Sequence, residues 1–190
     1  METDYLFNYL NSIRPLSPDL KKFLLANLIF DTFNIGDQLP YRPPISTTLY
    51  FVNYGLLSGT HTQNHNKSTL WFSKEGSFIL PLPNSTGKQF IDRIEFLKPT
   101  LLIGLESPLI QRTIDEFPET LSLFIRIIEQ NRIESNNREL FLRLPSQERC
   151  SQLFNLMPNL FIDSNSDQLA SYLNISKRQL MRIKPHLKTK

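Results

Sequence analysis

Three basic residues near the C-terminal end of the chain have the spacing that places positive charge on one side of a helix. Lys177 and Arg178 are adjacent, and Arg182 follows one turn later. An arginine can donate two hydrogen bonds to O6 and N7 of guanine, and a lysine can contact either a base or a phosphate. Arg178 and Arg182 are therefore candidate base-reading side chains, and Lys177 is a candidate for either contact.

Two short helices would be needed to hold this basic side outward. Asn165 and Ser176 are each followed three residues later by a glutamine, Gln168 and Gln179, which is the pattern of a capping box at a helix start. Between the two predicted helices, Asn174 occupies a turn position that needs a positive φ, which asparagine tolerates. The apolar residues that would lock the helices together are Leu169, Ala170, Leu173, Ile175, Leu180 and Ile183. The segment is predicted to be a helix-turn-helix.

The polar residues at the two helix starts are candidates for contacts with the DNA backbone. Ser176, Gln179 and Asn165 could contact phosphates together with the free N–H groups of the first helical turns. Such contacts position a protein on DNA without reading its sequence. The alternative is a helical hairpin whose basic side is only solvated.

Charge is distributed unevenly along the chain. The net charge is +3, from 21 basic and 18 acidic residues, but six basic residues and no acidic residue lie between Asn174 and the C-terminal end. The part before Asn174 is therefore mildly acidic. A cationic segment on an acidic body is common in modules that bind polyanions, because released counterions supply much of the affinity for nucleic acid. A solvated basic tail is the alternative.

The composition excludes several classes of protein. A chain of 190 residues with 40% hydrophobic and 21% charged residues is typical of one or two folded modules. No segment approaches the roughly 20 apolar residues of a membrane helix, and METDYLFNYL lacks the features of a signal peptide, so a cytoplasmic location is expected. Cys150 is the one cysteine, so it cannot form an internal disulfide, and it is interpreted as a small core residue.

The first part of the chain has the apolar spacing of helices, and the part that follows has the residue pattern of strands. A first helix is predicted over 5–13, and a second begins at Ser17 with Pro18 in its first turn. From about residue 30 to 113, short aromatic and β-branched runs alternate with Gly, Pro, Asn and Ser, which predicts an all-β block. Its clearest strands are Thr48–Tyr54, Ser68–Ser73, Phe90–Phe96 and Thr100–Leu105. Imperfect alternation in the third of these favours a small rolled barrel over an open sheet.

After Pro118 the apolar spacing is that of a long helix with more than one buried side. Leu121, Phe124, Ile125 and Ile128 form one stripe, beside a second apolar edge. One side can cover the β-block, and the other would meet a second copy of the same helix across a two-fold axis, so a homodimer is predicted. The alternative is an internal core helix.

Two further short helices are predicted near 137–144 and 146–156, before Pro158 interrupts the pattern. The fold class is therefore predicted to be α+β. The expected parts are 1–117, a β-roll with flanking helices; 118–144, a dimerisation helix and linker; and 145–190, an all-α helix-turn-helix domain.

Three stretches carry a resemblance to a known family over nearly the whole chain. They are Leu49-Tyr-Phe-Val-Asn-Tyr-Gly55, Phe72-Ser-Lys-Glu-Gly-Ser-Phe-Ile79 and Gln168-Leu-Ala-Ser-Tyr-Leu-Asn-Ile-Ser-Lys-Arg-Gln-Leu-Met-Arg-Ile183. The chain resembles the Crp/Fnr family of bacterial transcription regulators. The resemblance implies a cyclic-nucleotide-binding-like β-roll (a double-stranded β-helix or jelly roll), a long dimerising helix and a DNA-binding C-terminal domain. It also implies that the base-reading positions are those of Lys177, Arg178 and Arg182.

The effector cassette of the family does not carry over. Members that bind cyclic AMP place Gly-Glu after a glycine-containing turn, and an Arg-Ser or similar pair further along, to hold the ribose and the cyclic phosphate. Counted from Gly76, those positions are Leu80, Pro81, Ile91 and Asp92, so the ribose carboxylate and the phosphate guanidinium are missing. An anion buried there would lack a charge partner, and cyclic AMP is not expected to bind.

A different effector site is the other interpretation of this region. Ser85, Thr86 and Lys88 lie between the two lost pairs and could line a pocket for an unidentified small molecule. A plain surface loop is the alternative.

No metal, haem, other cofactor or catalytic site is predicted. A single cysteine cannot hold an iron–sulfur cluster, and His61, His65 and His186 lack metal-ligand spacing with carboxylates or thiols. The sequence has no nucleophile–base spacing and no phosphate-binding glycine loop. Scattered acids such as Glu95 are interpreted as surface strand positions, so an enzyme is not expected.

The predicted function is a dimeric, sequence-specific DNA-binding regulator of the Crp/Fnr type that does not respond to cyclic AMP. Its expected partners are double-stranded DNA, a second copy of the chain and a small-molecule effector if the β-roll still senses one, but not a membrane. The alternative is a dimeric ligand- or protein-interaction module with a vestigial helix-turn-helix. Binding to one DNA sequence at physiological salt would separate the two.

Overall fold

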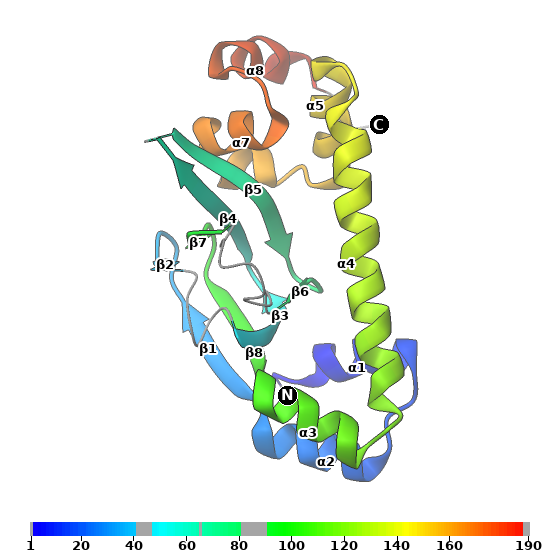
Figure 1. Cartoon of the computed structure of the whole chain (residues 1–190). Coiled ribbons are helices and arrows are strands. Elements are labelled where there is room, and N and C mark those ends of the chain that lie inside the picture. The colour runs from blue at the N-terminus through cyan, green and yellow to red at the C-terminus, as the bar shows by residue number, and fades with distance from the viewer. Residues whose placement is uncertain (1, 41–46, 65, 81–90, 188–190) are drawn as a thin grey trace.

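A computed structural model describes residues 2–40, 47–64, 66–80 and 91–187. The chain folds into two four-stranded sheets with helices at both ends and one long helix along the side (Figure 1). The helices are α1 (Asp4–Ile13), α2 (Pro18–Asn27), α3 (Ser107–Glu116), α4 (Thr120–Leu142), α5 (Ser146–Leu156), α6 (Leu160–Asp163), α7 (Ser166–Leu173) and α8 (Lys177–Ile183). The strands are β1 (Ile29–Phe33), β2 (Gln38–Pro40), β3 (Thr48–Tyr54), β4 (Leu56–Gln63), β5 (Asn66–Lys74), β6 (Phe78–Ile79), β7 (Arg93–Phe96) and β8 (Thr100–Glu106).

The two sheets face each other across an apolar core, which confirms the predicted α+β fold with a β-roll. The first sheet has the strand order β1-β8-β3-β6 and the second β2-β7-β4-β5, and the paired strands are antiparallel. Side chains from both sheets fill the space between them, among them Tyr50, Val52, Leu57, Phe96 and Leu102, each at most 1% exposed. The roll therefore has an apolar core of its own.

Helices cover the outer face of the first sheet, so its central strands are buried on both sides. In β3, Tyr50 and Val52 belong to the core of the roll, whereas Phe51 packs against α1. In β8, Leu102 belongs to the roll and Ile103 to the cluster under the helices. This two-sided burial explains why both strands are continuous apolar runs instead of alternating ones.

Two boundaries predicted from the sequence are wrong. The β-block ends at Glu106, not near residue 113, because helix α3 begins at the next residue. Pro108 lies in the first turn of α3, where the backbone N–H that proline lacks is not needed for helical hydrogen bonds. The short helix predicted near 137–144 is instead the last part of α4, which has no glycine or proline to interrupt it. The helix predicted over 146–156 is α5, with the predicted bounds.

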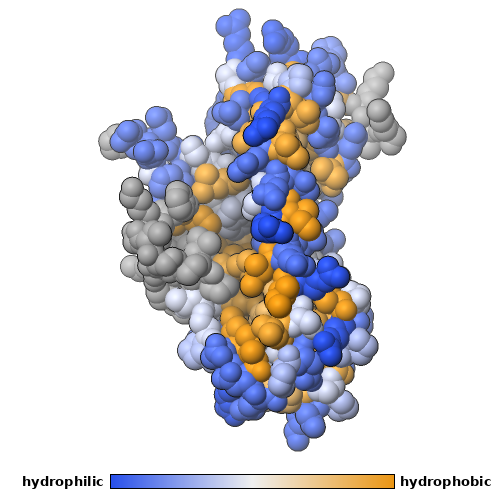
Figure 2. All heavy atoms as spheres, turned by 45° about the vertical axis from the view of Figure 1, so that its right-hand side comes forward, coloured by the Kyte–Doolittle hydropathy of each residue, from blue (hydrophilic) through white to orange (hydrophobic). Residues whose placement is uncertain are grey.

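The long helix α4 divides its apolar side chains between two faces. Leu123 and Ile127 are 4% and 3% exposed in the core below, and Phe124 is partly buried against the same cluster. The exposed apolar residues of this half are Leu121, Ile125 and Ile128. Figure 2 shows apolar side chains gathered along the lower part of the face that α4 presents. Although α4 has 23 residues, neither it nor another described helix is apolar over enough length to cross a bilayer.

Strand β7 corrects the interpretation of Glu95. Ile94 and Phe96 point into the roll, so Arg93 and Glu95 lie on the outer face of the second sheet. Arg93 is exposed, but Glu95 is only 5% exposed, because α7 covers this part of the sheet. Glu95 is a buried carboxylate and not a surface strand position.

Candidate nucleic-acid interface

Both predicted capping boxes are present in the C-terminal helices. The side chain of Asn165 accepts a hydrogen bond from the N–H of Gln168 (2.8 Å), and the Gln168 side chain accepts one from the N–H of Asn165 (3.3 Å). Ser176 and Gln179 make the same reciprocal bonds at the start of α8 (3.1 and 3.4 Å). These bonds satisfy N–H groups that a helix start leaves unpaired, so they define where α7 and α8 begin.

The turn between α7 and α8 is held by a buried arginine from α5. Asn174 has φ 51° and ψ 51°, the predicted left-handed conformation. Arg149 is 9% exposed, and its Nη2 donates to the carbonyl of Asn174 (3.3 Å), while Nη1 donates to the carbonyls of Leu142, the last residue of α4, and Leu144, two residues later. The sequence analysis did not single out Arg149, because an arginine on an amphipathic helix is usually exposed.

The apolar sides of α7 and α8 meet in one core, as the spacing predicts. The residues of the helix pair in this core are Leu169, Ala170, Leu173, Leu180 and Ile183, none more than 9% exposed. Cys150 of α5 belongs to the same cluster and is fully buried, which confirms it as a core residue. Helix α8 ends at Ile183, the last of these core residues, and the 3-10 turn Lys184–His186, which contains Pro185, follows it directly.

The three predicted basic residues lie on the opposite side of α8 and are exposed to solvent. Lys177, Arg178 and Arg182 are all exposed, as is Met181 between them. Lys177 forms an exposed ion pair with Asp167 (Nζ–Oδ2, 2.9 Å), which a polyanion can displace at little cost. No ion pair between Arg178 or Arg182 and another described residue is present. The helix lies at the end of the molecule opposite α1, α2 and α3 (Figure 1).

The three polar candidates for phosphate contacts are used inside the capping boxes. The side-chain oxygens of Asn165, Ser176 and Gln179 accept hydrogen bonds from helix-start N–H groups. The groups of these three side chains that can still bind a phosphate are hydrogen-bond donors: the Ser176 hydroxyl and the amide N–H groups of Asn165 and Gln179. This pattern of donors fits an anion.

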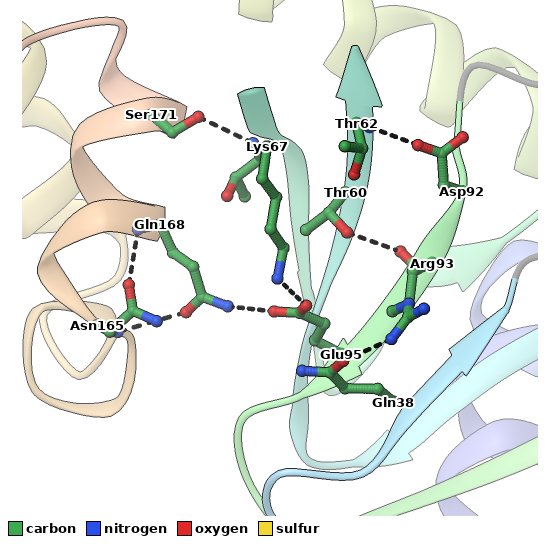
Figure 3. Close-up of polar contacts among 11 residues, drawn as sticks. Gln38, Thr60, Thr62, Lys67, Asp92, Arg93, Glu95, Asn165, Gln168 and Ser171 are labelled. Atoms are coloured by element: carbon green, nitrogen blue, oxygen red, sulfur yellow. Dashed lines mark hydrogen bonds and ion pairs between the residues drawn. The ribbon is translucent and has the colours of Figure 1, made fainter. Parts of the chain in front are cut away.

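Helix α7 is fastened to the second sheet by buried polar contacts (Figure 3). Gln168 Nε2 donates to Glu95 Oε2 (2.6 Å), and the other oxygen of Glu95 pairs with Lys67 of β5. The backbone N–H of Thr69 donates to the Ser171 hydroxyl (2.9 Å). These contacts set the orientation of α7, and through the shared core they set that of α8.

An aromatic clamp holds α7 from two sides. The guanidinium of Arg138 on α4 lies 3.8 Å from the centre of the Tyr172 ring, and Phe72 of β5 meets the same ring edge-on at 4.9 Å between centroids. Burial raises the pKa of the Tyr172 hydroxyl and lowers the pKa of Arg138. The sequence analysis missed this clamp, because its three residues come from separate elements and form no local pattern.

The positions of the effector cassette lie in different surroundings. Leu80 is partly buried against the cluster under the helices, and Ile91 is 8% exposed in the core of the roll. Asp92 is exposed, accepts a hydrogen bond from the N–H of Thr62 and lies 3.2 Å from His61 Nδ1. Outside the described residues lie Pro81, Ser85, Thr86 and Lys88. Within the described part of the chain, no group of three or more His, Cys, Asp or Glu side chains could hold a metal ion.

No protein-family model matches the chain, and no curated protein matches it in sequence. Its fold is nevertheless shared with several solved structures. One is FixK2 from Bradyrhizobium japonicum, with a TM-score of 0.68 and 10% identity over 84% of this chain and 83% of that one. A second, from Eubacterium rectale, is described as a transcriptional regulator of the Crp/Fnr family, with a TM-score of 0.69 and 16% identity over 94% of this chain and 87% of that one.

A third structure is CLP from Xanthomonas campestris, described as a global regulator responsive to c-di-GMP. Its TM-score is 0.62 at 12% identity, over 90% of this chain and 91% of that one. At such identities the likeness is one of fold. The chain has the fold of Crp/Fnr regulators, with a cyclic-nucleotide-binding-type β-roll and a helical C-terminal part.

Proposed function

We propose that the chain is a sequence-specific DNA-binding transcription regulator of the Crp/Fnr type. The observation that carries the proposal is the outward basic face of α8, where Lys177, Arg178 and Arg182 are exposed while the other side of the helix is fixed in a core. Helices α7 and α8 with the turn at Asn174 then act as a helix-turn-helix, and α8 enters the major groove. Fold neighbours described as transcription regulators support this.

Each polar residue of the interface has a role in this proposal. Arg178 and Arg182 donate to guanine edges, and Lys177 contacts a base or a phosphate. Asn165, Ser176 and Gln179 hold the position of the helices against the DNA backbone. The chain is then divided into a sensor part (1–117), a dimerisation helix and linker (118–144) and a DNA-binding domain (145–190).

The proposed regulator is a homodimer formed through α4. Leu121, Ile125 and Ile128 are 49%, 47% and 55% exposed on successive turns of one face, and a second copy of α4 would cover them. A two-fold axis there would place the two copies of α8 about 34 Å apart, so that each could enter one of two consecutive major grooves. The recovered DNA site would then be a near-palindrome.

Cyclic AMP is not the effector in this proposal. Three of the four cassette positions, Leu80, Pro81 and Ile91, are apolar and offer no group for a ribose or a cyclic phosphate. A calorimetric titration of the purified protein with cyclic AMP is expected to give no binding, and a dissociation constant of ~1 μM would contradict the assignment.

Selection of bound sequences from random DNA duplexes tests the proposal directly. The unmodified protein is expected to recover one sequence with two-fold symmetry at physiological salt. The double variant Arg178→Gln/Arg182→Gln should lose at least ~10-fold in affinity for that sequence, since each arginine–base contact contributes about 1–3 kcal/mol. The double variant Lys22→Gln/Arg112→Gln, which also removes two exposed positive charges, from α2 and α3, is the matched control and should bind normally.

The same experiment distinguishes the proposed regulator from the alternative function, an interaction module. An interaction module with a vestigial helix-turn-helix would bind DNA only weakly, without sequence preference and with strong salt sensitivity. If the double variant still selects the same sequence as the unmodified protein, the base-reading roles of Arg178 and Arg182 are wrong.

A further inference from the structure

The outer face of the second sheet carries a polar pocket separate from the proposed DNA interface. The pocket is open to solvent on one side, has a volume of about 330 Å³ and is lined by Gln38, Thr60, Thr62, Lys67, Asp92 and Arg93. It lies outside the roll, because the alternate residues of β7, Ile94 and Phe96, are the ones that fill the interior between the sheets. Its volume is at the lower end of the range for small-molecule sites, about 300–1,000 Å³.

Arg93 is a cation of this pocket that has no carboxylate partner among the described residues. Its Nη1 donates one hydrogen bond to the neutral amide of Gln38 (Oε1, 2.8 Å), which leaves most of the guanidinium donors unused. Asp92, by contrast, already accepts from the N–H of Thr62 and lies 3.2 Å from His61 Nδ1. The unused guanidinium donors of Arg93 are the feature of the pocket that suits a carboxylate or phosphate oxygen.

Lys67 connects this pocket to helix α7 (Figure 3). Its ammonium group pairs with Glu95 Oε1, and Glu95 Oε2 accepts a hydrogen bond of 2.6 Å from Gln168. Gln168 also forms the capping box with Asn165 that begins α7. Because the Glu95 side chain is only 6% exposed, its charge depends on Lys67 for compensation.

We propose that the pocket binds a small hydroxylated anion and that its occupancy loosens α7 from the sheet. One carboxylate or phosphate group is held by Arg93 and Lys67, and the hydroxyl groups of the ligand face Thr62, because the Thr60 hydroxyl is buried and donates to the Arg93 carbonyl. The bound anion shares Lys67 with Glu95, so the buried contact between Glu95 and Gln168 loses part of its charge compensation. The inference concerns the sheet and α7 alone and does not depend on DNA binding.

Binding is tested by NMR titration of the full ¹⁵N-labelled chain with three compounds. Inorganic phosphate and D-gluconate present the two anionic groups, and D-sorbitol presents the same hydroxylated carbon chain as gluconate without the carboxylate. Saturable shifts at the backbone signals of 60–62 and 92–93 are expected with at least one of the anions and not with sorbitol. The anion that binds more tightly identifies the ligand as a phosphate or a carboxylate.

Two variants decide whether Arg93 is the anion-binding group. Arg93→Gln should weaken binding at least ~10-fold, the loss expected for a charge-assisted hydrogen bond. Arg112→Gln removes the same charge from α3 and should leave binding unchanged. The site is refuted if neither anion saturates below ~10 mM, or if Arg93→Gln binds as tightly as the unmodified chain.

Hydrogen exchange, measured without DNA, tests the link to α7. With the anion bound, the amides of 166–173 should exchange about 10-fold faster than in the free protein. Glu95→Gln removes the buried charge and should abolish this response while Arg93 still binds the anion. Should Glu95→Gln not fold, Lys67→Met tests the link without any anion: it leaves the Glu95 charge uncompensated, so 166–173 should exchange faster in the free variant than in the free unmodified protein. Unchanged exchange at saturating anion would overturn the link, whatever the outcome of the DNA experiments.

Discussion

At the scale of single residues, burial decides the chemistry of Cys150. The side chain is fully buried between α5 and the helix pair, and desolvation raises the pKa of its thiol. Because the thiolate is the reactive form, labelling by a disulfide reagent at pH 8 should be at least ~100-fold slower in the folded protein than in urea. Rapid labelling of the folded chain would show that the thiol is accessible.

The same raised pKa predicts how stability depends on pH. The folded state holds the thiol proton more tightly than the unfolded state, so this contribution is fully present below the ordinary thiol pKa and is lost as pH rises through the folded value. Urea denaturation at pH 7 and pH 10 should show a larger loss of unfolding free energy for the unmodified protein than for Cys150→Ala. Equal losses would mean that the thiol does not contribute.

At the scale of elements, the left-handed turn between α7 and α8 determines the angle of the proposed recognition helix. Asn174 has φ 51° there, and a residue with Cβ but no compensating polar group is strained in this conformation. Asn174→Ala should lower the unfolding free energy by about 1 kcal/mol, whereas Asn174→Gly should change it by much less. Thermal or urea denaturation measures both, and equal stability of the two variants would contradict this account of the turn.

At the scale of the whole molecule, the proposed dimer depends on the exposed row of Leu121, Ile125 and Ile128 on α4. Ile125→Glu places a charge in the middle of this row and should convert the dimer to a monomer in sedimentation velocity at micromolar concentration. Ile133→Glu is the matched control, since Ile133 is 49% exposed, close to the 47% of Ile125, but lies about 120° around the helix from Leu121 and about 140° from Ile128. A dimer that survives Ile125→Glu would place the interface elsewhere.

The sequence by itself determined the features that contiguous residues encode. Both capping boxes, the turn at Asn174 and the bounds of α5 follow from residue types within one or two turns of each other, where cap and turn geometry depend on local hydrogen bonds. The outward direction of Lys177, Arg178 and Arg182 also follows from local spacing, because the apolar residues of α8 must face the core.

Only the tertiary structure decided which charged residues are buried and what they hold. Glu95 looks like a surface position in its own strand, and only α7, more than 70 residues later, removes it from water. Arg149 and Arg138 likewise acquire their roles from carbonyls and a ring on other elements. The physical reason is that burial and charge compensation depend on which segments meet in space, and the local sequence pattern contains no information about a partner so far along the chain.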